Sequence, residues 1–281
     1  MKMHEIQLGW PPGHFYSPIP SIEEVKIKEK KIFNNIPNKI SGVNLNEEGQ
    51  LNLLRQLKKY YGNQPFEAYK KEKLRYFFEN PNYSYGEAVI LHCMIRYTQP
   101  KKIVEIGSGY SSCAILDTNE FFFDNAISCT FIDPYPQLIQ SLIKDSDIGK
   151  IEIIQKNIQD VEIDRFSKLS AGDILFIDSS HVSKVNSDVN HIFFEILPYI
   201  KRGVYVHFHD VGYPFEYPKE WIYEGRAWNE AYLLRAFLQY NNIFKIQFYN
   251  SFLACIYKDI VNDNMPIFMK NPGTSIWIQK I

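Results

Sequence analysis

The sequence predicts an α/β fold: a doubly wound, mostly parallel sheet of seven strands, preceded by an N-terminal extension of helices and irregular chain. Short apolar runs alternate with helical patterns from residue 103 onward, which is the signature of such a sheet. Polar residues or glycine follow these apolar strands at their carboxyl ends, where open α/β sheets bind ligands. The chain of 281 residues, 45% of them hydrophobic, is long enough for one large domain with an elaborated end.

Composition excludes several classes of protein. A formal net charge of −1 gives no electrostatic basis for binding nucleic acid or an anionic membrane. No apolar run approaches the about 18 residues of a transmembrane helix, and Met1–Glu5 lacks the apolar core of a signal peptide. We therefore expect a cytoplasmic protein. The cysteines lie in apolar runs without C-x-x-C spacing, which predicts buried free thiols at Cys93, Cys113, Cys129 and Cys255.

Residues 1–80 are expected to form an N-terminal unit of arm and helices, ahead of a main domain over residues 81–281. Within the leader of about 40 residues, the prolines of Trp10–Pro20 exclude a helix and disfavour a central strand. The aromatic residues of this segment normally seek burial. We therefore expect an arm packed on the domain surface, and the alternative is a lid that folds over the active site.

Helices are expected along the rest of this extension. Ser21 is a suitable N-cap for a charged helix that runs to Lys31. Further helices are expected over 46–61 and 65–80. Another helix begins after Tyr83–Glu87 and leads into the first strand.

Beyond residue 102, the apolar pattern predicts each element in turn. Strands are expected over 103–106, 128–132, 151–155, 173–177, 203–208, 244–249 and 274–279. Helices are expected over 111–120, 135–145, 186–199 and 228–241.

The turn after the first of these strands is the main candidate for a ligand site. Val104–Ile106 ends in Gly107-Ser108-Gly109, and Ser111 and Ser112 can cap the helix that follows. Glycine at these positions allows backbone N–H groups to approach a ligand closely. A structural strand–helix joint would give the same pattern.

An acid at the end of the next strand strengthens this interpretation. Ser128–Ile132 is followed by Asp133, whose carboxylate is placed to accept hydrogen bonds from two ribose hydroxyls. Ser112 stands where the dinucleotide pattern G-x-G-x-x-G has its third glycine, which argues against a pyrophosphate ligand.

The strand acid Glu105, the glycine turn and Asp133 together resemble a class I S-adenosylmethionine-dependent methyltransferase. The resemblance implies S-adenosyl-L-methionine as cofactor and the Rossmann-like methyltransferase fold, with a final antiparallel strand. It also implies that Tyr83 and Tyr85, just before the first strand, are candidate lid residues, although a plain helix start is the alternative. The cofactor-binding set that it implies is Glu105, Gly107, Ser108, Gly109, Asp133, Gln159, Asp160 and Asp178. Either Gln159 or Asp160 would contact the adenine edge.

The fourth and fifth strands end in Asp178-Ser179-Ser180-His181 and His207-Phe208-His209-Asp210. Strand periodicity places His207 and His209 on one face. One interpretation is general-base catalysis, with His181, His209 and Asp178 as the catalytic residues. The other is a divalent metal held by Asp178, Asp210 and His209, which we favour because these residue types are common ligands.

Two further considerations bear on this choice. Buried, hydrogen-bonded sheet histidines would need neither chemistry. The sequence resembles the branch of O-methyltransferases that act on small molecules and sugars, some of which use magnesium. Relatives that use a metal more often have a carboxylate where this chain has His209, and an imidazole points to a softer metal or to a base.

The segment after the fifth strand is rich in aromatic residues and is a natural substrate wall. The candidates are Tyr213, Tyr217, Trp221, Arg226 and Trp228. Such residues would suit a carbohydrate or equally a contact in a homo-oligomer. The family resemblance includes enzymes that accompany bacterial surface-polysaccharide biosynthesis, which suggests O-methylation of a sugar or another small hydroxylated acceptor.

Two other functions remain open from the sequence. One is a nicotinamide- or nucleotide-sugar-binding oxidoreductase on a similar sheet. The other is a non-catalytic methyltransferase-like scaffold, against which the polar strand ends argue because unneeded buried charges are costly.

Overall fold

A computed structural model of the chain describes residues 9–281. The start of the predicted leader, including Met1–Glu5, where no signal peptide is expected, lies outside the described residues. Within residues 9–281, no helix combines the length and the apolar character needed to cross a membrane.

The core of the molecule is the predicted seven-stranded sheet, with strand order β3-β2-β1-β4-β5-β7-β6. The strands are β1 (Lys102–Ile106), β2 (Ser128–Ile132), β3 (Glu152–Ile154), β4 (Ile174–Ile177), β5 (Tyr205–Phe208), β6 (Phe244–Tyr249) and β7 (Ile276–Lys280). Neighbouring strands from β3 to β5 are parallel, and β7 lies antiparallel between β5 and β6. The predicted fold class and the antiparallel final strand are therefore confirmed.

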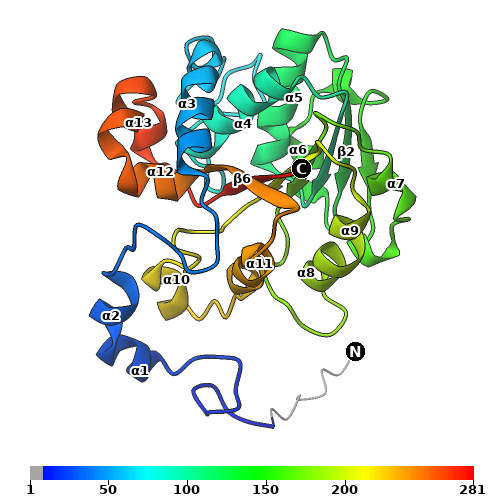
Figure 1. Ribbon diagram of the computed structural model, residues 1–281. Helices are drawn as coiled ribbons and strands as arrows, with labels where there is room; N and C mark the ends of the chain where they lie inside the picture. The colour runs from blue at the N-terminus through cyan, green and yellow to red at the C-terminus, as the bar shows by residue number, and fades with distance from the viewer. Residues whose placement is uncertain (1–8) are drawn as a thin grey trace.

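Helices cover both faces of the sheet (Figure 1). The α-helices are α1 (Ile22–Ile27), α2 (Glu29–Phe33), α3 (Glu47–Tyr61), α4 (Tyr85–Thr98), α5 (Tyr110–Phe123), α6 (Gln137–Leu142), α7 (Asp164–Ser167), α8 (Asp188–His191), α9 (Leu197–Tyr199), α10 (Lys219–Tyr223), α11 (Glu230–Leu238), α12 (Asn250–Ile256) and α13 (Lys258–Asn264). The other helical segments are the 3-10 helices η1 (Asp145–Asp147), η2 (Ile158–Asp160) and η4 (Phe268–Lys270) and the π-helix η3 (Ile192–Ile196). Helices α3, α4 and α5 pack in one layer, and α8, α9 and α11 lie on the other side of the sheet. The strands between the layers are apolar because both faces are buried, as all of Ile174–Ile177 is.

Two details of the sequence prediction are wrong. Residues 65–80 are irregular rather than helical, because the backbone N–H groups of Arg75 and Tyr76 donate to the Asp117 carboxylate instead of to a helix. The helix predicted over 186–199 is confirmed as a continuous helical run of α8, η3 and α9, in which η3 is π-helical. Cys255 is exposed, whereas the other three cysteines are buried as predicted.

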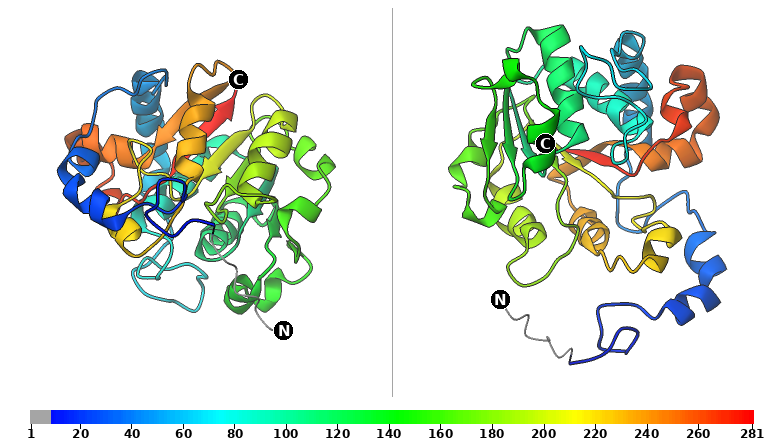
Figure 2. Two further views of the ribbon diagram at one scale, coloured as in Figure 1. Left: turned by 90° about the horizontal axis from the view of Figure 1, so that it is seen from below. Right: turned by 180° about the vertical axis from the view of Figure 1, so that it is seen from behind.

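The N-terminal arm, residues 9–36, lies on the side of α10 and α11 (Figure 2). Ser21 caps α1 as predicted, with its side chain accepting from the Glu24 N–H at 3.3 Å. The expected burial of the aromatic residues in this arm is wrong. Phe15 is 90% exposed, and Trp10 stacks on His14 within the arm, with ring centroids 4.4 Å apart.

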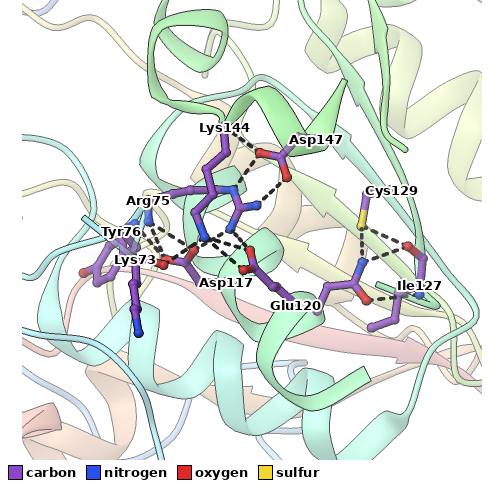
Figure 3. Close-up of polar contacts among 10 residues, drawn as sticks. Lys73, Arg75, Tyr76, Asp117, Glu120, Ile127, Cys129, Lys144 and Asp147 are labelled. Atoms are coloured by element: carbon purple, nitrogen blue, oxygen red, sulfur yellow. Dashed lines mark hydrogen bonds and ion pairs between the residues drawn. The ribbon is translucent and has the colours of Figure 1, made fainter. Parts of the chain in front are cut away.

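A buried arginine fixes the segment that precedes α4 (Figure 3). The Arg75 side chain is 1% exposed and pairs with Asp117 on α5 at 2.8 Å, with Glu120 at 2.7 Å and with Asp147. Glu120 also accepts from Lys144 Nζ at 2.8 Å. These acids and the Asp117 hydrogen bonds hold Arg75 and Tyr76 against α5, so the irregular chain before α4 has a fixed position.

Removing Arg75 is expected to destabilise the whole protein. In Arg75→Met, three carboxylates lose their shared cation, and breaking a buried ion pair costs about 3–5 kcal/mol. Arg165→Met is the matched control, because the Arg165–Glu152 pair is solvent-exposed and is expected to contribute under about 1 kcal/mol. Denaturant unfolding of both variants measures the difference. Equal losses would contradict a special role for the buried cluster.

Candidate active site

The carboxyl ends of the parallel strands meet at one edge of the sheet, as the strand order requires. Gly107 follows β1, Asp133 follows β2, Asp178 follows β4, and His209 and Asp210 follow β5. The segment before β7 arrives at the same edge, because β7 runs antiparallel. The tertiary structure therefore collects at one edge the polar strand ends that the sequence indicated.

Gly107 determines how closely the turn after β1 approaches β4. Its φ is +82°, a left-handed conformation that favours glycine, and a Cβ at this position would lie 2.2 Å from the Asp178 carbonyl oxygen. The Asp178 N–H donates to the Ile106 carbonyl at 2.8 Å. The glycine turn and Asp178 are thus in direct backbone contact.

Glu105 lies beneath this turn. Its buried carboxylate accepts from the Ser111 hydroxyl and, at 2.7 Å, from the Ser112 hydroxyl, and Ser112 Oγ accepts from the Gly109 N–H at 3.0 Å. Burial raises the pKa of Glu105 to about 8, although the two serines oppose this shift. Glu105 therefore supports the turn and the start of α5.

A cavity of about 610 Å³, which we call the turn cavity, opens beside the turn. Its lining residues are Ile106, Gly107, Ser108, Ile132, Asp133, Pro134, Tyr135, Asn157, Ile158, Gln159, Asp178, Ser179, Ser180, Lys184, Asn186, Ser187 and Asp188. Five residues of the predicted cofactor set are among them: Gly107, Ser108, Asp133, Gln159 and Asp178. Glu105, Gly109 and Asp160 are not.

Asp133 is held in a fixed orientation in this cavity. One carboxylate oxygen accepts from Ser108 Oγ at 2.6 Å, and the other accepts from the Tyr135 N–H at 2.7 Å. A carboxylate offers about four acceptor positions, so capacity for further hydrogen bonds remains.

Gln159 and Asp160, which the sequence did not separate, differ in position. Gln159 lines the cavity, and its side-chain amide donates to the Asn186 carbonyl at 2.6 Å. Asp160 is exposed and does not line the cavity.

Beside the turn cavity, carboxylates and imidazoles alternate in a row that we call the carboxylate–imidazole chain. Its members in order are Glu87, His209, Asp210, His181 and Glu230. Glu87 Oε1 lies 3.2 Å from His209 Nδ1, and His209 Nε2 lies 3.5 Å from Asp210 Oδ1. On the other side, Asp210 Oδ2 lies 3.7 Å from His181 Nε2, and His181 Nδ1 lies 2.9 Å from Glu230 Oε2. Asp178 joins the chain at 3.4 Å from His181 Nε2.

The carboxylates of the carboxylate–imidazole chain raise the pKa of both histidines. Desolvation opposes the charged form of His181, but Asp178 and Glu230 outweigh it and raise its pKa to about 10. Desolvation is likewise outweighed at His209, where Asp210 and Glu87 raise the pKa well above its usual value. Burial raises the pKa of Asp210. Two imidazolium ions can therefore compensate the surrounding carboxylates.

The predicted metal ligands do not fit a metal ion in this arrangement. Within residues 9–281, no three His, Cys, Asp or Glu side chains are grouped so as to hold one. Between Asp178 and Asp210 lies His181 Nε2, at 3.4 and 3.7 Å from their oxygens. A protonated imidazole in this position supplies the positive charge that the two acids need.

His207 is a buried histidine that packs against aromatic rings. It does share a strand face with His209, their ring centroids being 6.1 Å apart. However, His207 is 1% exposed, stacks on Phe176 at 3.9 Å and contacts the Trp277 ring. Desolvation lowers its pKa well below the usual value, so this histidine is neutral and packed.

Neither candidate lid tyrosine lines the turn cavity. Tyr83 is buried, and its ring centroid lies 5.5 Å from that of His209. Tyr85 stacks on Phe78 and donates a hydrogen bond to Glu79.

The predicted substrate residues form two groups. Tyr213 and Tyr217 line a second cavity of about 320 Å³, which we call the arm cavity, between arm residues 32–36 and loop residues 212–220. The Trp228 ring centroid lies 4.4 Å from that of His181, and the Arg226 guanidinium covers the rings of Trp221 and Trp228 at 4.7 and 5.0 Å.

The sequence did not predict Glu87 and Glu230 as site residues, although they are the two outer members of the carboxylate–imidazole chain. Glu87 forms a capping box with Ser84, and Glu230 is the first residue of α11. An acid in the first turn of a helix is so common that no local pattern connects either one with a histidine.

The chain is similar in sequence to known proteins. A family model described as a methyltransferase domain matches residues 104–211. A protein of Archaeoglobus fulgidus, described only as uncharacterized, is 33% identical over 171 residues, which cover 55% of this chain and 77% of that protein.

Solved structures of low identity are also similar. A Podospora anserina methyltransferase, PaMTH1, with bound SAH is 14% identical, with 92% of this chain and 94% of that chain covered and a TM-score of 0.47. The O-methyltransferase TomG from Streptomyces achromogenes, in complex with SAM, is 12% identical, with 92% and 96% covered and a TM-score of 0.44.

The contact between Gly107 and Asp178 can be tested without a ligand. Gly107→Ala introduces a Cβ into a left-handed conformation and against a backbone carbonyl, which is expected to cost about 1–3 kcal/mol of unfolding free energy. Gly109→Ala is the control, since its Cβ would meet only the flexible Leu138 side chain at 3.1 Å. Denaturant unfolding should give a clearly smaller loss for the control. Equal stability of the two variants would contradict this account of the turn.

Proposed function

Because the chain belongs to the class I S-adenosylmethionine-dependent methyltransferases, we propose that it methylates an oxygen atom of a small hydroxylated acceptor, with a histidine as general base. The observation that carries the proposal is the position of Asp178. This residue lines the turn cavity and also contacts His181 in the carboxylate–imidazole chain. A methyl donor in the turn cavity and a base in the carboxylate–imidazole chain would therefore both lie next to Asp178.

The turn cavity suits the cofactor in size and chemistry. Its volume of about 610 Å³ lies within the range of small-molecule sites. The Gly107 turn can lie against the amino-acid end of the cofactor, Asp133 can accept from the ribose hydroxyls, and Gln159 can meet the adenine edge. The role of Glu105 in this proposal is to position the turn from beneath.

His181 is the residue that we propose as the base. S-adenosylmethionine supplies a methyl group on a positively charged sulfur, and the acceptor oxygen bonds to that carbon as the carbon–sulfur bond breaks. The hydroxyl proton moves to His181 Nε2. Glu230 at Nδ1 fixes the tautomer that leaves Nε2 able to accept a proton. Asp178 and Asp210 then stabilise the resulting imidazolium.

Oxygen is the acceptor atom that this chemistry favours. An alcohol has a pKa near ~15 and needs help to ionise, whereas a neutral amine needs much less. The aromatic rings near His181 support a sugar or another hydroxylated ring as the acceptor, because aromatic faces pack on apolar ring surfaces.

Cofactor binding is tested by thermal stabilisation. S-adenosylmethionine or S-adenosylhomocysteine at 100 times its dissociation constant should stabilise the native protein by about 2.7 kcal/mol. Asp133→Ala and Gln159→Ala should reduce this effect, whereas Asp160→Ala, the matched exposed control, should leave it unchanged. Stabilisation by NAD, with none from either methyl-donor compound, would support an oxidoreductase instead.

The base is tested by the pH dependence of methyl transfer. Only neutral imidazole accepts a proton, and the pKa of His181 is raised to about 10, so the rate should rise with pH above 6.5. Glu230→Gln removes a negative charge from His181 and should move this rise to lower pH. His181→Ala should lower kcat by about 10²–10⁴.

Activity in the presence of a chelator distinguishes a histidine base from a metal-assisted mechanism. Full activity is expected in excess chelator. Loss of activity in chelator, with recovery on addition of one divalent metal, would show that the base assignment is wrong.

A further inference from the structure

We propose that the arm cavity holds the body of the acceptor, and that this acceptor is a neutral hydroxylated ring compound. The inference rests on the proposed function, because it assigns the second substrate of the same reaction. It gives the N-terminal arm a role as a fixed wall of the acceptor site.

The position of the arm cavity along the sheet edge supports this assignment. The turn cavity is lined by residues that follow β1, β2, β3 and β4, among them Asp178. The carboxylate–imidazole chain then spans the ends of β4 and β5. The arm cavity follows on its far side, where Gly212 follows β5 and Thr274 precedes β7.

Thr274 connects the arm cavity with the chain. It lines the cavity, and its hydroxyl donates to Asp210 Oδ1 at 3.2 Å. Asp210 in turn lies 3.7 Å from His181 Nε2. An acceptor held in the arm cavity would thus present a hydroxyl group at Thr274, beside the chain that contains the proposed base.

The walls of the cavity favour a ring with apolar faces. The arm contributes Ile32, Phe33 and Ile36, and the facing loop contributes tyrosine and proline side chains over residues 213–218. A volume of about 320 Å³ is at the lower end of the range for small-molecule sites, which suits a small ring compound rather than a polymer.

Two of the charged residues at the cavity, Lys219 and Glu216, already have partners within the protein, and the third, Glu220, is exposed to solvent. Lys219 Nζ donates to Glu29 at 2.8 Å, and Glu216 accepts from the Tyr232 hydroxyl at 2.5 Å. A charged acceptor would have to compete with these pairs. The pairing therefore favours a neutral molecule.

The same contacts hold the arm in place. Glu29 accepts from both Lys219 Nζ and the Tyr223 hydroxyl, each at 2.8 Å, and the Tyr213 hydroxyl donates to the Pro37 carbonyl. Loop 212–220 and α10 are thus tied to the arm at both ends of the segment that lines the cavity. A wall fixed in this way can select an acceptor by shape.

The test is ligand-observed NMR on the full chain saturated with S-adenosylhomocysteine. The probes are phenol, catechol, methyl β-D-glucopyranoside and myo-inositol. We expect the wild-type protein to bind at least one of them. Phe33→Ala and Ile36→Asp should each weaken that binding about tenfold or more, as the loss of apolar contacts in a pocket does. Ile27→Ala is the matched control, because Ile27 lies in the same arm, is 83% exposed and does not line the cavity.

The outcomes distinguish the two levels of the proposal. Absence of S-adenosylhomocysteine binding to the wild-type protein would overturn the proposed function itself. Cofactor binding without binding of any probe, or probe binding unchanged in both arm variants, would overturn the acceptor assignment alone. Equal weakening in Ile27→Ala would overturn it as well. Thermal melting of each variant guards against misfolding, and Ile36, which is 46% exposed, is the position at which substitution is better tolerated.

Discussion

The candidate site depends on the backbone contact between the turn after β1 and the end of β4. Gly107 adopts a left-handed conformation that leaves no room for a Cβ against the Asp178 carbonyl, and the Asp178 N–H bonds to Ile106. This contact places the turn cavity next to the residue at which the carboxylate–imidazole chain begins. Any side chain at residue 107 would separate the two, so a single glycine couples the proposed cofactor site to the proposed base.

The carboxylate–imidazole chain is stable because each buried charge has a neighbour of opposite charge. Burying an isolated carboxylate is costly, but each of the two imidazoles lies between acids contributed by different elements. Glu87 and Glu230 come from the first turns of α4 and α11, where the helix dipole also favours negative charge. His181 and Asp210 adopt left-handed conformations, with φ of +59° and +55°. Such conformations in residues other than glycine are uncommon and occur often at functional sites.

The N-terminal extension has two parts with different roles. Helix α3 packs against α4 and β6, and its Leu53, Leu54 and Leu57 belong to the main hydrophobic core. The Arg75 cluster then fixes the irregular chain that leads to α4 and so to Glu87. The arm of residues 9–36 instead keeps its aromatic residues exposed and is tied to loop 212–220 by polar contacts. Its expected packing by aromatic burial is wrong, because Trp10 packs against His14 and Tyr16 within the arm itself.

The sequence alone determined the sheet, its strands and the polar residues that end them. Those features follow from local periodicity and from glycine and acids placed directly after apolar runs, which short segments encode. Only the tertiary structure decided that residues 65–80 are irregular, since Asp117 on α5 takes the backbone N–H groups that a helix would have used. The tertiary structure also decided that Glu87 and Glu230 flank the histidines and that His181 lies between Asp178 and Asp210. Glu87 and His209 are more than a hundred residues apart in the chain, and a helix-capping acid looks the same in sequence whether or not a distant imidazole packs against it.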